Sequence, residues 1–266
     1  MTEAANGSAS EAAKIPGSIQ VIERMMSLLD ALADSSEPAS LKQLAATAQL
    51  HPSTAHRILA AMTHARFVER QDVGNYRLGI RLLELGAIVK SRINLREVAQ
   101  PFMQELHEKI GEAINLGARH DDEIVYLERT SSGRALVRVV YLVGGRAPLH
   151  LTSLGKLFLA DDGPQKIRDY AKRTGLPGKT PHSLTTLAAL EKEIEKVRRH
   201  GIAYDDEEAE LGLKCVAAPI HDDEGNVVAA LSVSAPADRH DPNWVTLLKQ
   251  TADAVSHALG YINLKK

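Results

Sequence analysis

The sequence has little cysteine, no long apolar run and almost no net charge, and each scarcity excludes a class of protein. Its one cysteine, Cys215, can form neither an internal disulfide nor a cysteine-rich zinc site, so we expect a reducing, cytoplasmic compartment. No apolar stretch reaches the roughly 18 residues that a membrane span needs, so we expect no membrane partner. Residues 1–14 lack the basic-then-apolar order of a secretory signal.

A formal charge of −2 over 266 residues argues against a protein coated in basic side chains. No internal repeat of roughly 20–50 residues is found, which excludes a repeat architecture. What is present is an ordinary globular composition, 44% hydrophobic and 25% charged, in a chain long enough for two domains.

The charge is distributed unevenly. Residues 14–92 hold ten Lys and Arg against seven Asp and Glu, whereas residues 93–266 hold 22 against 25. The basic residues of the stretch 51–81 are Arg57, Arg66, Arg70, Arg77 and Arg81, against Glu69 and Asp72. Such asymmetry hints at a nucleic-acid-binding module joined to a second domain, although charge alone is more simply a solvated surface.

Residues 1–17 are predicted to be a flexible tail. Apolar residues at helical spacing then predict a helix capped by Ser18, a short helix capped by Ser40, and a third helix that starts at Pro52. The third helix is expected to bury one face, made of Ala55, Ile58, Leu59 and Met62. Two strand-like runs, 67–70 and 75–78, follow around a turn.

Three helices followed by a hairpin are typical of a winged helix-turn-helix. We place this domain at residues 18–79, with the helix-turn-helix at about 40–65 and the wing at 67–78. Residues 80–94 follow as a linker helix that is too apolar for a passive tether, so it is expected to pack against a partner helix.

The remaining residues, 95–264, mix strands and helices. Strand patterns occur at 113–119, 123–129, 136–141, 203–206, 216–221 and 227–235. Helical patterns run from 98 to 110 and occur at 152–160, 163–173, 185–201 and 242–264. Short links and helices inserted in blocks predict an antiparallel sheet covered by helices, so the expected fold class is α+β with two domains.

The winged domain predicts the residues that would read DNA. The second helix of a helix-turn-helix lies in the major groove, so its N-terminal side chains Ser53, Thr54, His56 and Arg57 are candidates for phosphate and base contacts. Arg70 and Arg77 on the hairpin are candidates for the flanking backbone or minor groove. Helix-turn-helix units also serve as protein-docking modules, but the hairpin and the local positive charge favour DNA.

These segments resemble the IclR family of bacterial transcriptional regulators. The resemblance rests on Leu41–Ala45, Pro52–Leu59 and Tyr76–Gly79 in the first part, and on Gly145–Lys156, Asp205–Glu208, Gly212, Cys215–Ile220, Gly225 and Ser232–Ser234 in the second. It covers about residues 18–263 in the family's order. Two positions depart from the family, which commonly has glycine where Gln49 and Arg66 stand; Arg66 would suit a phosphate contact.

The resemblance implies a GAF/profilin-like C-terminal domain that binds a small organic acid in a cavity over the sheet. Its implied lining is Leu136 and Val139 on a strand, Ala147 at a turn, Ser153 and Leu154 at a helix start, and Asp205, Leu213, Cys215, Ser232 and Ser234. The chemistry agrees, because a helix N-terminus suits a carboxylate and two serines at i and i+2 point to one face of a strand. Thr152–Gly155 resembles members that sense larger or aromatic acids.

Asp205 is harder to interpret, because a carboxylate repels a carboxylate ligand unless it is protonated or bridged by a donor. It would instead orient a hydroxyl or hydrate oxygen of the ligand. Without the family resemblance, Ser232 and Ser234 are also explained as small strand residues packed under a helix.

Three competing signals are weak. Gly155-Lys156 lacks the preceding glycine of a phosphate-binding loop. Cys215 has no nucleophile motif around it and is more simply a core or pocket cysteine. His120–Asp122 and His221–Asp223 are typical of polar turns rather than metal sites. We therefore expect no cofactor and no metal.

The expected function is a ligand-responsive repressor, or an activator, of a catabolic operon. It would act as a homodimer or tetramer on a palindromic operator in double-stranded DNA. Two alternatives stay open. One is an enzyme that converts a small acid with Cys215 or Ser232 as nucleophile and an accessory winged domain. The other is a constitutive DNA-binding protein whose second domain only oligomerises.

Overall fold

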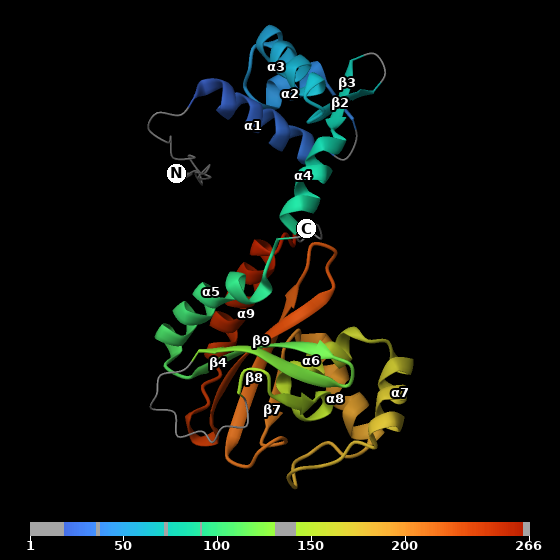
Figure 1. Cartoon of the computed structure of the whole chain (residues 1–266), viewed down its shortest axis with the longest axis vertical. Coiled ribbons are helices and arrows are strands. Elements are labelled where there is room, and N and C mark those ends of the chain that lie inside the picture. Colours follow the sequence, from blue (N-terminus) through green and yellow to red (C-terminus); the bar gives the residue numbers. More distant parts are fainter. Residues whose placement is uncertain (1–18, 36–37, 72–73, 91, 131–141, 263–266) are drawn as a thin grey trace, which may run out of the picture. The chain divides into compact units, whose positions relative to one another are not determined.

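The computed structural model describes residues 19–35, 38–71, 74–90, 92–130 and 142–262 (Figure 1). The chain divides into two compact units, Met1–Arg92 and Ile93–Lys266. The predicted tail, residues 1–17, lies outside the described residues.

The first unit combines α-helices with a small antiparallel sheet. Its elements are α1 (Gln20–Ala33), β1 (Ala39–Ser40), α2 (Leu41–Thr47), α3 (Pro52–His64), β2 (Val68–Gln71), β3 (Asn75–Leu78) and α4 (Ile80–Lys90). The strand order is β1-β3-β2, and the core contains Leu28, Leu44, Leu59 and Tyr76. The winged helix-turn-helix prediction is confirmed.

The structure of this unit differs from the sequence predictions in three local details. Helix α1 starts at Gln20 with Ile19, not Ser18, at the cap position, and no side chain caps it. Strand β1 was not predicted, because two residues carry no periodicity and Ala39 pairs with Tyr76 only through the tertiary fold. Ile58 is only half-buried. The predicted Ser40 cap is confirmed as a capping box with Gln43.

The two departures from glycine both take a left-handed backbone. Gln49 has φ 54° and Arg66 has φ 65°. Each follows the C-cap of a helix, and the same pair of hydrogen bonds closes both ends: after α3, the Phe67 N–H donates to the Met62 carbonyl (3.0 Å) and the Arg66 N–H to the Thr63 carbonyl (3.0 Å). This is the Schellman motif, in which glycine is preferred because it has no Cβ.

Gln49→Gly should therefore stabilise the winged domain by up to about 1 kcal/mol, since the left-handed conformation costs an L-residue about that much. Gln49→Ala is the matched control, because it shortens the side chain but keeps the Cβ. Urea unfolding of both variants checks the expectation; equal stability of the glycine and alanine variants would contradict it.

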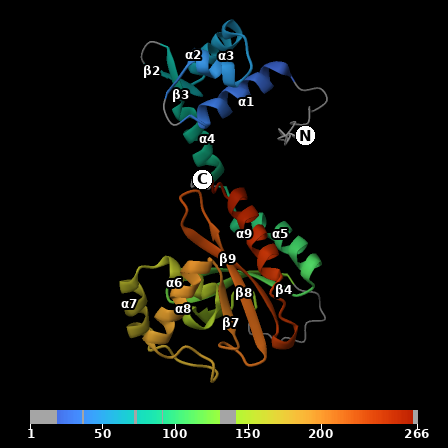
Figure 2. The ribbon, with the colours of Figure 1, turned by 180° about the vertical axis from the view of Figure 1, so that it is seen from behind.

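The second unit is a six-stranded antiparallel sheet with helices on both faces (Figures 1 and 2). Its elements are α5 (Leu95–Ile110), β4 (Ala113–His120), β5 (Glu123–Thr130), β6 (Arg146–Pro148), α6 (Ser153–Asp161), α7 (Pro164–Thr174), α8 (Leu187–His200), β7 (Ala203–Asp206), β8 (Leu213–His221), β9 (Val227–Pro236) and α9 (Trp244–Ala258), with short 3-10 turns at Leu149–Leu151 and Ala237–Arg239. The strand order is β6-β5-β4-β9-β8-β7.

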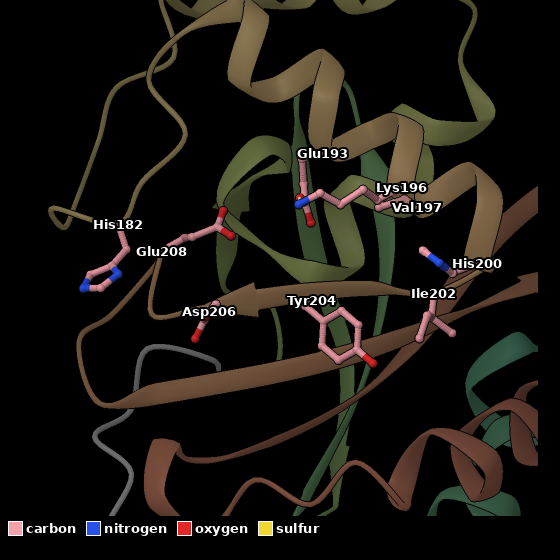
Figure 3. A pocket seen from close by; sticks show the side chains of 9 residues that line it. All are labelled: His182, Glu193, Lys196, Val197, His200, Ile202, Tyr204, Asp206 and Glu208. Carbon is pink, nitrogen blue, oxygen red and sulfur yellow. The ribbon is translucent and has the colours of Figure 1, made fainter.

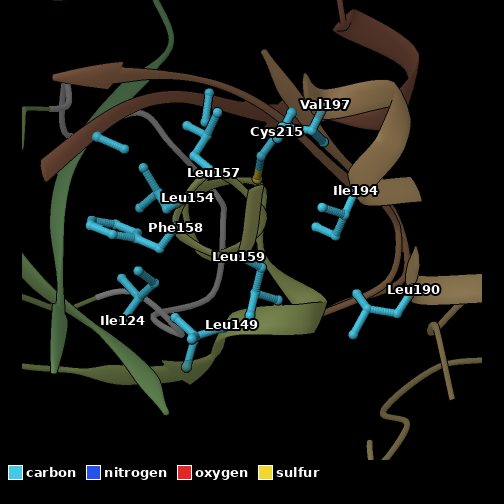
Figure 4. Close-up of a cluster of buried hydrophobic side chains, with 14 of the residues drawn as sticks. Ile124, Leu149, Leu154, Leu157, Phe158, Leu159, Leu190, Ile194, Val197 and Cys215 are labelled. Atoms are coloured by element: carbon cyan, nitrogen blue, oxygen red, sulfur yellow. The ribbon is translucent and has the colours of Figure 1, made fainter. Parts of the chain in front are cut away.

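Alternation along the strands divides the core of this unit into two layers. On one face Val216, Leu231 and Val233 pack with α5 and α9. On the other face Cys215 and Ala217 pack with Leu154 and Phe158 of α6 and with residues of α8 (Figure 4). The predicted antiparallel sheet covered by helices is confirmed.

Three details of this unit differ from the predictions, and one prediction falls on residues that the structure does not describe. Strand β8 begins at Leu213 rather than 216, and α9 ends at Ala258 rather than 264, shortly before Gly260 with φ 96°. Ala147, predicted at a turn, lies in edge strand β6 opposite Ile124. Three residues are too few to show alternation in the sequence. The predicted strand 136–141 falls outside the described residues.

None of the helices within the described ranges is both long and apolar enough to cross a bilayer.

Candidate nucleic-acid interface and ligand site

Helix α3 presents an exposed polar face at its N-terminal end. His51 caps the helix through its ring Nδ1, which accepts from the Ser53 N–H (3.4 Å) and lies 2.8 Å from the Ser53 hydroxyl. Ser53, His56 and Arg57 are exposed and occupy positions i, i+3 and i+4, so they share one face. Thr54 is half-buried and, with Arg57, also borders a groove of about 660 Å³ between α1 and α3.

The arginines of the wing and of the neighbouring segments differ in whether they form ion pairs with carboxylates. Arg77 donates twice to one oxygen of Glu69 (2.9 and 2.7 Å), which lowers the pKa of Glu69 below its ordinary value. Arg66 and Arg81 both pair with Glu84 of α4. Arg66 therefore already has an anionic partner where a phosphate was predicted. Within the described ranges no carboxylate pairs with Arg57 or Arg70, so these two offer the least compensated charge.

In the second unit, polar side chains form a buried row across the sheet on the face that α6 covers. Cys215 of β8 lies opposite Ser234 of β9 and Asp205 of β7, and Ser232 lies opposite Asn115 of β4. Directly opposed residues share a face of the sheet. The Cys215 Sγ is 3.1 Å from the Ser234 Oγ. We call Asp205, Cys215, Ser232, Ser234 and Asn115 the polar row.

The predicted ligand residues are brought together only in part. All of those within the described residues are buried: Ala147, Ser153, Leu154, Asp205, Leu213, Cys215, Ser232 and Ser234. Ala147 is on β6, and β5 separates it from β4, the strand at the near end of the polar row. Leu136 and Val139 lie outside the described residues.

The start of α6 lies against the sheet face that carries the polar row. Thr152 caps the helix by accepting from the Gly155 N–H (3.0 Å), and Ser153 and Leu154 occupy the first two helical positions, where N–H groups have no intrahelical acceptor. A Cβ on Gly155 would lie 2.3 Å from the Leu149 backbone, and one on Gly117 of β4 would lie 2.9 Å from the Leu154 side chain. Gly117 therefore lets the helix start approach the sheet closely, and Gly155 lets it pack against the preceding 3-10 turn.

Asp205 is buried among these groups, and burial raises its pKa to about 7. Its Oδ1 accepts from the backbone N–H groups of Glu208 (2.8 Å) and Ala209 (3.3 Å), which stabilise the charged form but do not offset the burial. At neutral pH both the protonated and the ionised carboxyl are therefore populated. The repulsion expected from the sequence is reduced accordingly.

This pKa predicts a pH-dependent stability. In the unfolded chain Asp205 releases its proton near its ordinary value of 3.8, and in the folded protein near 7, so folding is favoured below 3.8 and that advantage is lost as pH rises to 7. At about 1.4 kcal/mol per pH unit the loss is roughly 4 kcal/mol. Asp205→Asn keeps the side-chain oxygen that accepts from the two backbone N–H groups and should abolish this slope. The measurement is the difference in urea unfolding between wild type and variant across pH 4–8; parallel curves would contradict the assignment.

The geometry disfavours nucleophilic chemistry at Cys215. The thiol is buried, and burial together with the neighbouring Asp205 raises its pKa well above the ordinary value. The thiolate is the nucleophilic form of cysteine, so at neutral pH this group is an inert thiol.

The sequence analysis missed two polar features of this domain. Asn115 joins the two serines of the polar row. Lys156 of α6 is fully buried, and its Nζ donates to Glu208 Oε1 (2.6 Å) and to the Tyr204 carbonyl (2.7 Å). Asn115 could have been noticed as a polar residue at a buried position of an alternating strand, whereas nothing local marks Lys156 as buried.

A cavity of about 470 Å³ lies beside the Lys156–Glu208 pair, between α8 and the outer edge of β7 (Figure 3). Its polar lining includes His182, Glu193, Lys196, His200, Tyr204 and Glu208. None of the predicted ligand residues lines it. Lys196 pairs with Glu193 (2.8 Å), so this lining is largely charge-compensated.

Polar turns occupy the positions considered for metals. His120–Asp122 contains the β4–β5 turn, where Asp122 pairs with Arg173 (2.8 Å), and His221–Asp223 leads from β8 into the next turn, with His221 stacked on Tyr261. Among the described residues no group of three His, Cys, Asp or Glu side chains has a geometry that could hold a metal ion.

Comparison with known proteins identifies both units. Residues 21–72 match the family described as "IclR helix-turn-helix domain", and residues 87–257 match "Bacterial transcriptional regulator IclR C-terminal". The chain is 31% identical over 210 residues to the "Transcriptional repressor IclR" of Escherichia coli K12, covering 78% of this chain and 76% of that protein. It is 32% identical over 210 residues to the E. coli K12 repressor AllR, covering 79% and 77%.

Solved structures agree. The Agobacterium tumefaciens repressor BlcR superposes with a TM-score of 0.83 at 26% identity, covering 92% of this chain and 99% of that one. An IclR homologue from Microbacterium hydrocarbonoxydans complexed with 4-hydroxybenzoate superposes with a TM-score of 0.59 at 29% identity, covering 90% and 98%. The chain therefore belongs to the IclR family of bacterial transcriptional regulators.

Proposed function

We propose that this protein is a ligand-responsive transcriptional repressor that reads its operator with α3 and senses a small carboxylic acid at the polar row. The observation that carries the proposal is the polar row itself, which gathers buried hydroxyls, a carboxyl whose pKa is raised to about 7 and an unpaired amide oxygen on one face of the sheet. An unpaired polar atom is costly inside a core unless something binds it. Control of a catabolic operon is the role we assign to it.

The acid would be held by groups that this chain supplies. The Ser232 and Ser234 hydroxyls can donate to a carboxylate, as can the N–H groups at the start of α6, whose dipole favours negative charge. Protonated Asp205 can donate a further hydrogen bond. The homologue complexed with 4-hydroxybenzoate supports an acid as the ligand class.

Exposed apolar side chains support a homodimer formed through the first unit. On α1 and its cap these are Ile19, Val21, Ile22 and Met26, and on α4 they are Ile80, Leu83, Ile88 and Val89. Such a surface is unfavourable in a monomer. A two-fold dimer presents two copies of α3, which suits a palindromic operator in double-stranded DNA.

A repressor of this kind has an arrangement that binds the operator and one that does not. The ligand changes the affinity for DNA only to the extent that it binds these two arrangements with different affinities. A repressor of this kind performs no chemistry on the acid. The enzyme alternative requires a reactive Cys215 or Ser232, and the buried, protonated thiol argues against the first.

A binding assay with a product assay distinguishes the two. We expect some carboxylic acids to raise the melting temperature of the full-length protein and to be recovered unchanged after prolonged incubation, as followed by proton NMR. Turnover that disappears in Cys215→Ala or Ser232→Ala would favour the enzyme. A melting temperature that no acid moves would favour the constitutive DNA-binding protein.

A further inference from the structure

Asn115 is a fully buried polar side chain of the sheet, and only part of its hydrogen-bonding capacity is used. The residue is 1% exposed. Its Nδ2 donates to the Ser234 Oγ (3.0 Å) and the Ser232 Oγ (3.3 Å), so both amide hydrogens are used. Its Oδ1 is buried and accepts no hydrogen bond from any described residue.

The register of the strands determines which residues surround Asn115 Oδ1. Asn115 of β4 lies directly opposite Ser232 of β9 and next to the small Ala113 and Gly117 on its own face. Leu154, at the start of α6, and Ile124 of β5 are the side chains that approach Gly117. The unsatisfied oxygen therefore belongs to the same sheet face as the serines and the helix start that would hold a carboxylate.

An unpaired buried carbonyl is expensive, typically about 1–3 kcal/mol, and an alanine or valine would fit an interior strand without that cost. The two serine hydroxyls contact Nδ2 rather than Oδ1, and neither forms a hydrogen bond with Oδ1. A ligand that brings a donor would pair with Oδ1. A carboxylate has no donor, so an acid that pairs with Asn115 carries a second group that donates, such as a hydroxyl.

We infer that the effector of this protein is a hydroxy acid, whose hydroxyl donates to Asn115 Oδ1 while its carboxylate accepts from the serines and the start of α6. The inference rests on the proposed function and narrows its ligand class. Acids that have an oxo group or a hydrogen in place of the hydroxyl leave Oδ1 unpaired and bind less tightly. Asn115 is thus a specificity-determining residue.

Matched pairs of acids test the inference on the full-length protein. The probes are lactate against propionate and pyruvate, mandelate against phenylacetate, and 4-hydroxybenzoate against benzoate, each titrated by calorimetry. We expect the hydroxy acid of at least one pair to bind about 10- to 100-fold more tightly than its partner, because the partner leaves a buried acceptor unpaired. Equal affinities within every pair that binds would contradict the inference but leave the proposed function standing.

Two variants assign the preference to Asn115. Asn115→Leu keeps the branching at Cγ but is larger and has no acceptor, so the ratio of affinities should fall to about twofold or less. Ser232→Ala is the control: it should weaken both acids of a pair and keep their ratio, because Oδ1 is still present. A ratio that survives in Asn115→Leu would overturn the assignment.

The wild-type titration decides the matter even where Asn115→Leu does not fold. Tighter binding of the oxo or deoxy acids would contradict the inference and would mean that the amide presents its Nδ2 to the ligand. Failure of every acid to bind would contradict the proposed function as well.

Discussion

Arg57→Ala is expected to lower the affinity for the operator by between about 30-fold and 10,000-fold, with the fold intact. A bidentate arginine–guanine contact contributes about 1–3 kcal/mol of discrimination, and a two-fold dimer loses two of them. Arg57 is exposed on the N-terminal half of α3 and no described carboxylate pairs with it. The operator would be selected from random duplexes by the wild-type protein, and affinities measured by gel shift at one salt concentration.

Arg70→Ala is the control for this experiment. Arg70 is exposed on β2 and is expected to contact phosphate, so its loss should weaken binding to specific and random duplexes by the same factor. Arg57→Ala should weaken only specific binding. If Arg57→Ala leaves the preference for the selected operator unchanged, α3 does not read bases in the way described.

Lys156→Met is expected to lower the free energy of unfolding by about 3–5 kcal/mol, the usual effect of breaking a buried ion pair from one side. The Lys156 side chain is fully buried, with Glu208 at 2.6 Å and Glu193 at 3.9 Å. Burial raises the pKa of Glu208 in spite of the neighbouring ammonium, so the remaining carboxyl would be costly to keep ionised. Urea unfolding of the full-length protein at pH 7 measures the change.

Two further variants separate the ion pair from the rest of the side chain. Lys166→Met removes a 73% exposed lysine that pairs with Asp162, and should change stability by less than about 1 kcal/mol. Lys156→Met combined with Glu208→Gln should recover much of the loss, because no unpaired charge is left behind. A double variant as unstable as Lys156→Met alone would show that the stability comes from the packing of Lys156 and not from its charge.

The sequence was informative wherever a residue's role depends on its near neighbours. The Ser40 cap, the third helix at Pro52 and the strand 203–206 lie where spacing and capping rules put them. Gln49 and Arg66 were singled out because glycine is common in the family at those positions, and both have the left-handed backbone that glycine favours. Such features depend on a few consecutive residues.

Features that depend on pairing between distant segments could not be predicted from the sequence. Strands β1 and β6 are too short to show alternation and form only because Tyr76 and Ile124 lie opposite them. Asn115 is 117 residues from Ser232 in the chain, yet their side chains share a hydrogen bond. The partners of Arg66 and Lys156 likewise come from other elements, so no local pattern indicated that one arginine is compensated and one lysine is buried.

If the protein is a ligand-responsive repressor, occupation of the polar row changes the affinity of α3 for DNA. The most direct measurement is the operator Kd with and without a saturating acid that raises the melting temperature, in wild type and in Ser234→Ala. We expect the acid to shift the wild-type Kd by about 5- to 150-fold, the usual range of coupling between sites. In Ser234→Ala the unliganded Kd should be unchanged and more acid should be needed for the same shift. An operator Kd that stays the same in wild type while the acid is bound would contradict the account.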